Sequence, residues 1–267
     1  MASLSVTCLG LRGYEEMVEA QERLAGERFD GSIRDLLLLL EHPPTYTLGR
    51  RSEQSDLLHD ASWYREQGVE ICRTPRGGKV TYHGPGQLVA YPIIDLRGVG
   101  KQPSGGERVD VAGFVATLEQ AMSCALAEWG LPSGRIEGLT GLWVDDTRRS
   151  RKDFENADAA SAAPGLSRGS IRKIGSIGLK IRRGVTSHGL SLNVSCDLQP
   201  FDWINSCGIE SCRTTSIAAE LGNSGPSVDA VGAAVAEALA CALELQIVRG
   251  KPDQLGLAVP QRVDSVA

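Results

Sequence analysis

The stretch Asp35-Leu-Leu-Leu-Leu-Leu-Glu41 decides where the central sheet of this protein is expected to form. Five leucines stand between two acidic residues, and His42-Pro43-Pro44 follows them directly. The run is far shorter than the ~20 apolar residues that cross a membrane. A short apolar run that ends at prolines is typical of a buried strand. We therefore predict a buried strand over residues 35–41.

Outward from this strand, extended segments alternate with a few helical ones. Apolar residues recur at helical spacing in three segments, which predict helices over residues 14–29, 109–129 and 228–243. A short helix is expected over 60–67 and one helical turn over 200–206. Gly and Pro turns separate the segments expected as strands, which are 3–9, 46–48, 69–73, 79–82, 87–95, 142–144, 171–181 and 185–194. This pattern favours an α+β fold, a mixed β-sheet backed by helices on one side.

The composition is that of a folded protein without affinity for nucleic acid or membranes. Of 267 residues, 42% are hydrophobic and 23% are charged, which is typical of a globular domain. The net charge of -5 disfavours binding to phosphate backbones, because such binding needs a basic face. The first residues lack a basic segment followed by an apolar stretch, and they are not Arg-rich, so neither a secretory signal nor a transit peptide is expected.

One segment interrupts the pattern of elements. Residues 147–170 carry many charges and then an Ala/Ser-rich stretch, with almost no apolar periodicity. We expect a single catalytic domain over 1–255, a flexible insertion at 147–170 and a C-terminal tail over 256–267. A basic lip that docks an acidic carrier protein is the functional alternative for the insertion.

The chain has seven cysteines, an odd number that favours reduced thiols over a disulfide framework. Four of them stand in apolar periodic segments and are expected to be packing residues: Cys8, Cys72, Cys124 and Cys241. Cys207 differs, because Asn205-Ser206-Cys207-Gly208-Ile209 predicts an accessible thiol at a turn. Cys207, Cys212 and His188 could instead ligate zinc, but no second ligand pair with metal spacing is present. We expect neither a metal nor another cofactor.

Three further segments combine polar side chains with glycine. The run from Arg76 to Gln87 places basic and polar residues around a Gly-Gly turn, which can line a slot with backbone donors or be a simple hairpin. His83 in this run is expected to have few packing neighbours and to serve the site. Lys173 opens the apolar segment Lys173-Ile-Gly-Ser-Ile-Gly178 and would either face solvent or enter a slot. Thr186–Asn193 carries polar residues where a core strand would carry apolar ones, which suggests a lined cavity.

Together these segments resemble the lipoyl(octanoyl) transferase family. Arg76–Gln87 is similar to that family's Arg-Gly-Gly…Tyr-His-Gly-Pro-Gly-Gln signature, and Lys173–Gly178 to its Lys-Ile-x-x-Ile-Gly. Thr186–Asn193 resembles its Thr-Ser-His-Gly segment, Cys207-Gly208-Ile209 its Cys-Gly-Ile, and His42–Gly49 a common early stretch. Residues 147–170 and Ser206, where the family often has Pro, depart from the pattern.

The resemblance implies a fold similar to the catalytic domains of biotin and lipoate protein ligases. It implies transfer of an octanoyl group from octanoyl-acyl carrier protein to a lysine of lipoyl domains, as the first step of protein lipoylation. Those domains belong to 2-oxoacid dehydrogenase subunits and the glycine cleavage H protein. It also implies that Cys207 is the acyl-thioester nucleophile and Lys173 its activator, in a ping-pong cycle. The residues that it implies for substrate binding are Arg76, Gly77, Gly78, Lys79, Val80, Thr81, Tyr82, His83, Ser176, Ile177, Gly178, Gly189, Leu190 and Ser191.

Three other functions stay open on the sequence. An ATP-dependent lipoate or biotin ligase of the same fold needs no nucleophilic cysteine. A cysteine hydrolase would pair Cys207 with His188 or His83 and use water as acceptor. A silent acyl-binding or carrier-docking module would bind the octanoyl carrier without reaction. We expect a monomer, in the cytoplasm of a bacterium or alternatively in a mitochondrial matrix.

Overall fold

The structure is a computed structural model that describes residues 2–98, 109–136, 138–146, 154, 171–205, 213–222 and 225–257. Within these residues a nine-stranded mixed sheet runs in the order β12-β1-β2-β6-β10-β9-β8-β7, with β11 beside β9. Its strands are β1 (Ser3–Leu11), β2 (Asp35–Glu41), β6 (Gln87–Ile93), β7 (Gly134–Ile136), β8 (Leu139–Asp145), β9 (Ile171–Arg182), β10 (Val185–Asn193), β11 (Arg213–Thr214) and β12 (Gln246–Arg249). The α+β prediction is therefore confirmed.

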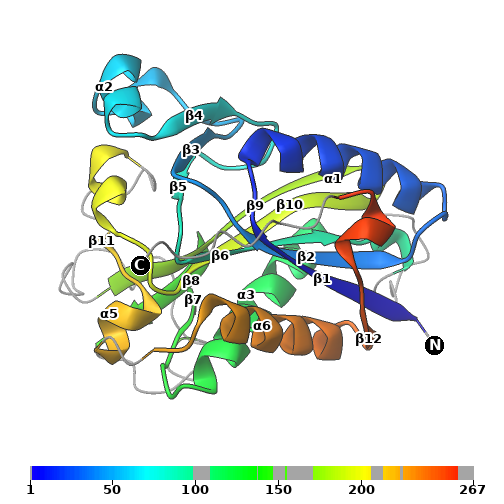
Figure 1. Cartoon of the computed structure of the whole chain (residues 1–267). Helices are drawn as coiled ribbons and strands as arrows, with labels where there is room; N and C mark the ends of the chain where they lie inside the picture. Colours follow the sequence, from blue (N-terminus) through cyan, green and yellow to red (C-terminus); the bar gives the residue numbers. More distant parts are fainter. Residues whose placement is uncertain are drawn as a thin grey trace, which may run out of the picture.

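Helices cover both faces of this sheet, so the expectation of helices on one side only is wrong. Helix α1 (Tyr14–Phe29) lies on one face, and α3 (Val111–Ala127) and α6 (Val228–Ala242) lie together on the other (Figure 1). The five leucines of β2 show the reason. Leu37 and Leu39 pack into the cluster beneath α3 and α6, whereas Leu36, Leu38 and Leu40 pack into the cluster beneath α1. A strand that is buried on both faces has no place for the polar residues of an alternating pattern.

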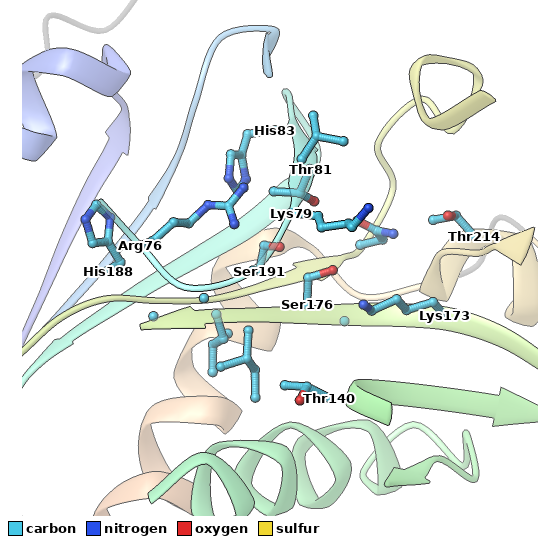
Figure 2. Close-up of a pocket in the computed structure, with 18 of the residues that line it drawn as sticks. Arg76, Lys79, Thr81, His83, Thr140, Lys173, Ser176, His188, Ser191 and Thr214 are labelled. Atoms are coloured by element: carbon cyan, nitrogen blue, oxygen red, sulfur yellow. The ribbon is translucent and has the colours of Figure 1, made fainter. Parts of the chain in front are cut away.

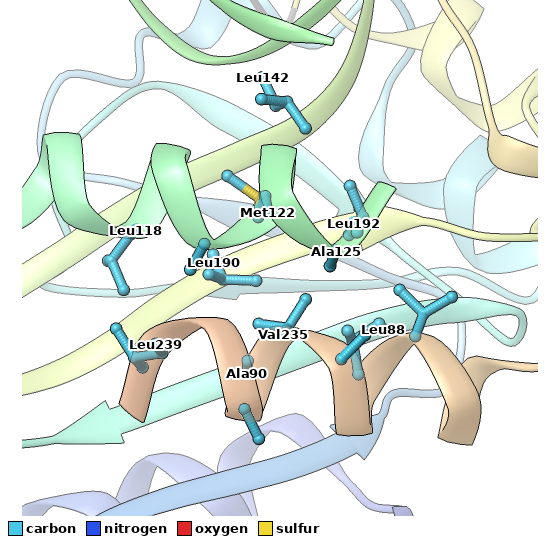
Figure 3. Close-up of a cluster of buried hydrophobic side chains, with 14 of the residues drawn as sticks. Leu88, Ala90, Leu118, Met122, Ala125, Leu142, Leu190, Leu192, Val235 and Leu239 are labelled. Atoms are coloured by element: carbon cyan, nitrogen blue, oxygen red, sulfur yellow. The ribbon is translucent and has the colours of Figure 1, made fainter. Parts of the chain in front are cut away.

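The larger core cluster joins α3 and α6 to the middle of the sheet. Figure 3 shows Leu118, Met122 and Ala125 of α3 and Val235 and Leu239 of α6 facing Leu88, Ala90, Leu190 and Leu192 of the sheet. Capping side chains fix where the two helices begin. Asp110 accepts a hydrogen bond from the backbone N–H of Gly113, and Ser227 accepts one from Ala230. This face of the sheet is thus apolar and covered by α3 and α6, whereas the opposite face of β9 and β10 is not covered by these helices.

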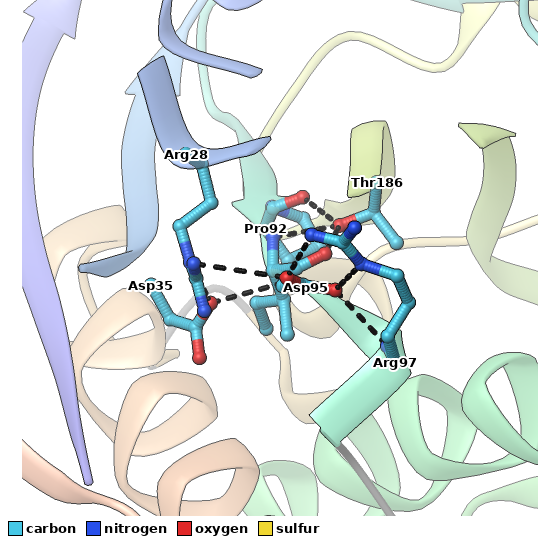
Figure 4. A network of polar contacts seen from close by, with 7 residues as sticks. Arg28, Asp35, Pro92, Asp95, Arg97 and Thr186 are labelled. Atoms are coloured by element: carbon cyan, nitrogen blue, oxygen red, sulfur yellow. Dashed lines mark hydrogen bonds and ion pairs between the residues drawn. The ribbon is translucent and has the colours of Figure 1, made fainter. Parts of the chain in front are cut away.

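A polar network ties α1 to the sheet at the start of β2 (Figure 4). The guanidinium of Arg28 donates to the Asp35 carboxylate at 2.6 Å, and the backbone N–H of Asp95 donates to the same carboxylate at 3.0 Å. Arg97 forms an ion pair with Asp95 at 2.6 Å. The Thr186 hydroxyl donates to the carbonyl of Pro92 at 2.7 Å. These bonds join α1, β2, β6 and β10 at the edge remote from residue 173.

A second, three-stranded sheet stands above the first, in the order β4-β3-β5. It consists of β3 (Thr45–Leu48), β4 (Glu70–Arg73) and β5 (Val80–His83), and α2 (Ala61–Glu66) and the 3-10 helix η3 (Gln199–Trp203) pack against it. Its core is aromatic: the Tyr46 hydroxyl donates to the carbonyl of Pro200 at 2.6 Å, and Phe201 packs against the Tyr82 ring. This sheet carries the Gly-rich turn between β4 and β5 over the main sheet.

The remaining short elements are η1 (Gln54–Asp56), η2 (Leu96–Gly98), α5 (Ile217–Leu221) and η4 (Pro252–Leu255). Leu257, near the start of the expected tail over 256–267, is buried against the cluster beneath α1. Residues 258–267 of this tail lie outside the described residues. So do residues 147–170 apart from Phe154, which is buried against Ile136 and Trp143.

Among the cysteines expected to be packing residues, Cys72 is buried, but Cys8 and Cys241 are exposed, contrary to expectation. Within the described ranges, no helix is both long and apolar enough to cross a bilayer.

Candidate active site

A cavity of about 320 Å³ opens between the two sheets, on the face of β9 and β10 that α3 and α6 leave uncovered. Figure 2 shows its length: Lys173 and Thr214 lie at one end, Ser176 and Ser191 in the middle, and Arg76, His83 and His188 toward the other. We call these the reactive end and the inner end. The residues that line the cavity are Tyr14, Arg51, Arg76, Gly78, Lys79, Val80, Thr81, His83, Tyr91, Gly138, Leu139, Thr140, Trp143, Lys173, Gly175, Ser176, Ile177, Gly178, His188, Gly189, Leu190, Ser191, Asn193, Phe201 and Thr214.

A register shift in the sheet places Lys173. On β8, Leu142 pairs with Gly175 and the next residue, Trp143, pairs with Lys173, so Ile174 is an extra residue in the ladder. Ile174 points into the core with no exposed surface. Such bulges re-aim neighbouring side chains. Lys173 therefore reaches the cavity, with its amine 5.4 Å from the centre of the Trp143 ring.

The backbone beside Lys173 is fixed by Gly141. Its φ of +124° is a conformation that side chains rarely adopt, and a Cβ atom there would lie 2.6 Å from the Gly175 oxygen and 2.8 Å from Cε of Lys173. The Gly141 N–H donates to the buried carboxylate of Glu119 on α3 at 2.9 Å. Burial raises the pKa of Glu119, although the bond from Gly141 and the charge of Arg135 oppose that shift. Glu119 and Gly141 thus hold the strand against which the lysine lies.

The floor of the cavity is the β9–β10 ladder. Ser176 pairs with Ser191, and two residues further on Gly178 pairs with Gly189. Above Gly178 lies Arg76, and a Cβ atom at residue 178 would come within 2.9 Å of its Cδ atom. The backbone N–H of Gly77 donates to the carbonyl of Leu179 at 2.9 Å, which attaches the Gly-rich turn to β9. Glycine at residue 178 thus lets the turn approach the ladder closely.

The Arg76 side chain at the inner end is buried, with 7% of its surface exposed. Its guanidinium donates to the Thr47 carbonyl and hydroxyl, at 2.5 Å and 2.8 Å, and to the carbonyl of Gly77 at 2.9 Å. Burial lowers the pKa of Arg76, and the nearby Tyr14 opposes that shift. No ion pair of Arg76 with a carboxylate occurs among the described residues.

Three of the four histidines gather around this inner end. His42 bonds to the Arg12 carbonyl at 2.6 Å and to the Tyr91 hydroxyl at 2.7 Å. His83 bonds to the Gln87 side chain at 2.7 Å. Burial lowers the pKa of His42 and of His188 to about 4 and that of His83 to about 3. All three rings are therefore neutral at pH 7.

Most of the predicted site residues lie together on this cavity. Lys173 and the residues of 176–178 and 189–191 all line it, and so do Arg76, Gly78, Lys79, Val80, Thr81 and His83. Gly77 and Tyr82 are absent from the lining, because Gly77 faces β9 and the Tyr82 ring packs into the small sheet. His83 does line the cavity, but the expectation of few packing neighbours is wrong, since it is 6% exposed and stacks on Tyr14. Cys207 lies outside the described residues.

Several lining residues were not predicted. Tyr14 comes from α1, Tyr91 from β6, Trp143 from β8 and Thr214 from β11. None of them stands beside a glycine-rich polar motif. They reach the site only because elements that are distant in sequence pack together. As for metal binding, the described residues contain no group of three His, Cys, Asp or Glu side chains that could hold an ion.

The comparisons with known proteins agree with this geometry. The family described as the lipoyl protein ligase A/B catalytic domain matches residues 13–240. An octanoyltransferase of Acidobacterium capsulatum is 41% identical over 82% of this chain and 80% of its own length. Those of Salinispora tropica and Mycobacterium leprae are 40% and 39% identical, over 85% and 91% of this chain and 91% and 88% of theirs.

The chain belongs to the octanoyltransferase family. Members of this family are acyltransferases, so the candidate site belongs to an enzyme. Solved structures agree in fold. A bipartite lipoate protein ligase of Thermoplasma acidophilum, studied with its E2 lipoyl domain, has a TM-score of 0.66 at 15% identity, over 96% of this chain and 91% of its own. A lipoate-protein ligase A bound with ATP has a TM-score of 0.64, also at 15% identity, over 96% and 92%. The predicted similarity to lipoate ligases is confirmed.

Proposed function

We propose that this protein transfers an octanoyl group from octanoyl-acyl carrier protein to the target lysine of lipoyl domains, through a thioester on Cys207. The observation that carries the proposal is the position of Lys173, which lies at one end of a cavity of about 320 Å³ in a chain whose relatives are octanoyltransferases. A lipoate ligase of the same fold was studied with its E2 lipoyl domain, which supports a lipoyl domain as acceptor.

The distribution of thiols supports Cys207 as the nucleophile. None of the five described cysteines lines the cavity. Cys196 is also buried, and burial raises the pKa of its thiol to about 12, which suppresses the reactive thiolate. The two other cysteines, Cys207 and Cys212, belong to the stretch between Asn205 and Arg213.

The neighbours of that stretch favour a thiol at the reactive end. Directly after it, Arg213 and Thr214 pair with Arg172 and Lys173 in a parallel ladder, and the Thr215 N–H donates to the Lys173 carbonyl at 2.9 Å. Directly before it, the Asn205 N–H donates to the Asp56 carbonyl at 2.8 Å. Both flanks therefore stay close to the cavity. An ammonium beside a thiol favours the thiolate, which is the reactive form.

The proposed cycle has two steps that balance in atoms and charge. In the first, the Cys207 thiolate attacks the carbonyl carbon of the carrier thioester, the bond from that carbon to the carrier sulfur breaks, and the carrier leaves as a thiol with a proton from Lys173. In the second, the neutral amine of the target lysine attacks the acyl-enzyme, an amide forms, and the bond to Cys207 breaks. The proton lost by the amine returns to Lys173, and the Cys207 thiolate is regenerated. An amide is more stable than a thioester, which drives the cycle forward.

The geometry disfavours the hydrolase alternative. His83 has its ring nitrogens directed at Gln87 and Thr47, and His188 stands at the inner end, away from Lys173. Neither imidazole is therefore placed to serve a thiol at the reactive end as general base. The ATP-dependent alternative is disfavoured by relatives that are octanoyltransferases rather than ligases.

The test is an intact-mass measurement on the purified full chain, incubated with octanoyl-acyl carrier protein and no ATP. We expect one octanoyl group on the protein, released by hydroxylamine and then transferred to an added lipoyl domain as a stable amide. Cys207→Ala removes the adduct, whereas Cys212→Ala, a matched thiol of the same stretch, keeps it.

An adduct that survives in Cys207→Ala would overturn the nucleophile. A protein that acylates the lipoyl domain only when octanoate and ATP are supplied would be a ligase instead.

A further inference from the structure

The inner end of the cavity is unexpectedly polar for a pocket that takes a hydrocarbon tail. The wall there is built from Arg76, His83 and His188 (Figure 2). The Tyr14 ring stacks on His83, and the Tyr91 ring makes a T-shaped contact with His188. An apolar end wall would favour ever longer tails, because each buried methylene adds to affinity. A polar end wall acts in the opposite direction.

His188 is the residue of this wall whose hydrogen bonding is incomplete. Its ring is 3% exposed, and its Nδ1 atom has no hydrogen-bond partner among the described residues. His42 and His83 differ, since their ring nitrogens face protein acceptors or donors. A buried polar atom without a protein partner in a cavity is ordinarily satisfied by water. The inner end thus requires a polar occupant.

The backbone holds His188 in this position. Its φ of +56° lies in the left-handed region, which is uncommon for residues other than glycine. The His188 N–H donates to the Oε1 atom of Gln21 on α1 at 2.6 Å, in a buried bond. Helix α1 therefore fixes the turn of the strand that carries the imidazole to the end of the cavity.

Arg76 adds a charge to the same wall. Its guanidinium donates to neutral oxygens of Thr47 and Gly77 and lies beside Tyr14, and no carboxylate of the described residues pairs with it. Water in the cavity would stabilise this charge. An alkyl group that displaced such water would leave a buried cation without solvation, which is costly.

The length of the cavity agrees with a chain of about eight carbons. Lys173 and Leu179, the partner of His188, are six residues apart on β9, which corresponds to about 20 Å along the strand. The amine of Lys173 points along the cavity toward Ser176 and takes up part of that length. An extended octanoyl chain measures about 9 Å, with carbon–carbon bonds of about 1.5 Å. Additional methylenes would therefore press against the wall.

We propose that the polar wall formed by Arg76 and His188 limits the acyl chain to about eight carbons, by making a longer tail displace the water that these two side chains need. The proposal rests on the octanoyl transfer proposed above. It makes Arg76 and His188 determinants of chain length at the end remote from the reacting atoms.

The relative sizes of two opposing effects on binding, burial of extra methylenes and loss of polar partners, support this limit on acyl length. Each methylene that enters an apolar pocket improves binding roughly fourfold, so two improve it about fifteenfold. Leaving one buried polar group without a partner weakens binding by a factor of roughly 5 to 150, and a buried charge weakens it more. Two such groups at one wall therefore outweigh the gain from two methylenes.

The experiment measures kcat/KM with octanoyl- and decanoyl-acyl carrier protein in competition, using the full chain. The wild-type protein is expected to prefer octanoyl by about tenfold. His188→Leu and Arg76→Met should each shift that ratio toward decanoyl by roughly tenfold. His188→Asn keeps a polar group and suits a positive φ, so its ratio should stay within about threefold of the wild type. Thr186→Val, a buried change on the same strand outside the lining, is the matched control and should leave the ratio unchanged.

The paired variants separate polarity from space. Equal shifts of the kcat/KM ratio in His188→Leu and His188→Asn would show that side-chain volume alone sets the preferred acyl length. An unchanged ratio in both His188→Leu and Arg76→Met would contradict the proposed role of the polar wall. Binding of octanamide and decanamide to the same proteins, followed by calorimetry, supplies the ratio without catalysis. If octanoyl transfer fails but the protein still prefers octanamide to decanamide, the proposed function is contradicted, whereas the proposed role of the polar wall is not.

Discussion

The reactive end and the inner end of the cavity are positioned by different means. At the reactive end, irregular backbone does the positioning: the extra residue Ile174 turns Lys173 into the cavity, and Gly141 makes room for its side chain. At the inner end, the side chains are held mainly by hydrogen bonds, such as that between His42 and Tyr91. The first end is sensitive to small changes in backbone path, and the second to changes in polarity and protonation.

Among changes at the reactive end, removal of the Lys173 amine is expected to have the largest effect on the rate of transfer. Lys173→Ala is expected to slow transfer to the lipoyl domain by about 10²- to 10⁴-fold, the usual contribution of a positioned general acid–base. Lys180→Ala is the matched control on the same strand, because its amine pairs with Glu22 at 2.9 Å rather than entering the cavity. The measurement is the rate of octanoyl transfer, with acyl-enzyme followed by mass. Similar rates in both variants would exclude Lys173 from the chemistry.

A second change tests whether backbone path matters at this end. Gly141→Ala adds a Cβ atom against Cε of Lys173 and the Gly175 carbonyl, so we expect transfer to fall roughly 10- to 100-fold through displacement of the amine. The strained φ should also lower the free energy of unfolding by about 1–3 kcal/mol. Gly26→Ala in α1 has open space around it and should be stabilising by about 0.5–1 kcal/mol, with unchanged transfer. Normal transfer in Gly141→Ala would show that the close contact does not hold the lysine.

Low pH is expected to lower the stability of the fold through the buried histidines at the inner end. Burial lowers the pKa of His42, His83 and His188 below the ordinary value of 6.5. Between about pH 6.5 and about 4 the unfolded chain binds protons that the folded chain does not, so stability is lost as the pH falls. The expected loss is about 1.4 kcal/mol per pH unit for each of these histidines, a tenfold change in the folding equilibrium.

Urea unfolding between pH 7 and pH 4.5 measures this slope. His83→Gln or His42→Gln should reduce it, whereas His59→Gln, at an exposed position, should leave it unchanged. Equal slopes in all these proteins would place the acid sensitivity elsewhere and remove the contrast between the two ends.

Much of this fold could be predicted from local patterns. Helical periodicity gave α1 its bounds, and the leucine run marked β2 as buried. What the run could not indicate is that alternate leucines belong to two different cores, because continuous burial has the same pattern whichever layer lies on each face. The separation of β3, β4 and β5 into their own sheet cannot be seen in any one segment, and the exposed strand β12 has only two apolar residues, Ile247 and Val248.

The site could be predicted where motif residues and lining residues coincide, as at Arg76, Lys173 and Ser191. Tyr14 and Tyr91 escaped prediction because each stands within an ordinary amphipathic or apolar element and reaches the cavity only through tertiary packing. The extra residue at Ile174 depends on the register between β8 and β9, which no single segment specifies. The absence of a partner for His188 Nδ1 likewise appears only when the surroundings of the strand are assembled.

The edge of the main sheet has a consequence for how the protein forms during synthesis. Strand β1 pairs in parallel with β12, so that Ser3 lies beside Gln246 and Val6 beside Arg249. Strand β1 thus waits for a partner that is made more than 200 residues later. Pairings of such high sequence separation slow folding, because the intervening chain must be ordered first. Until β12 is made, one edge of β1 has no partner strand, and an unpaired strand edge is a site at which nascent chains can aggregate.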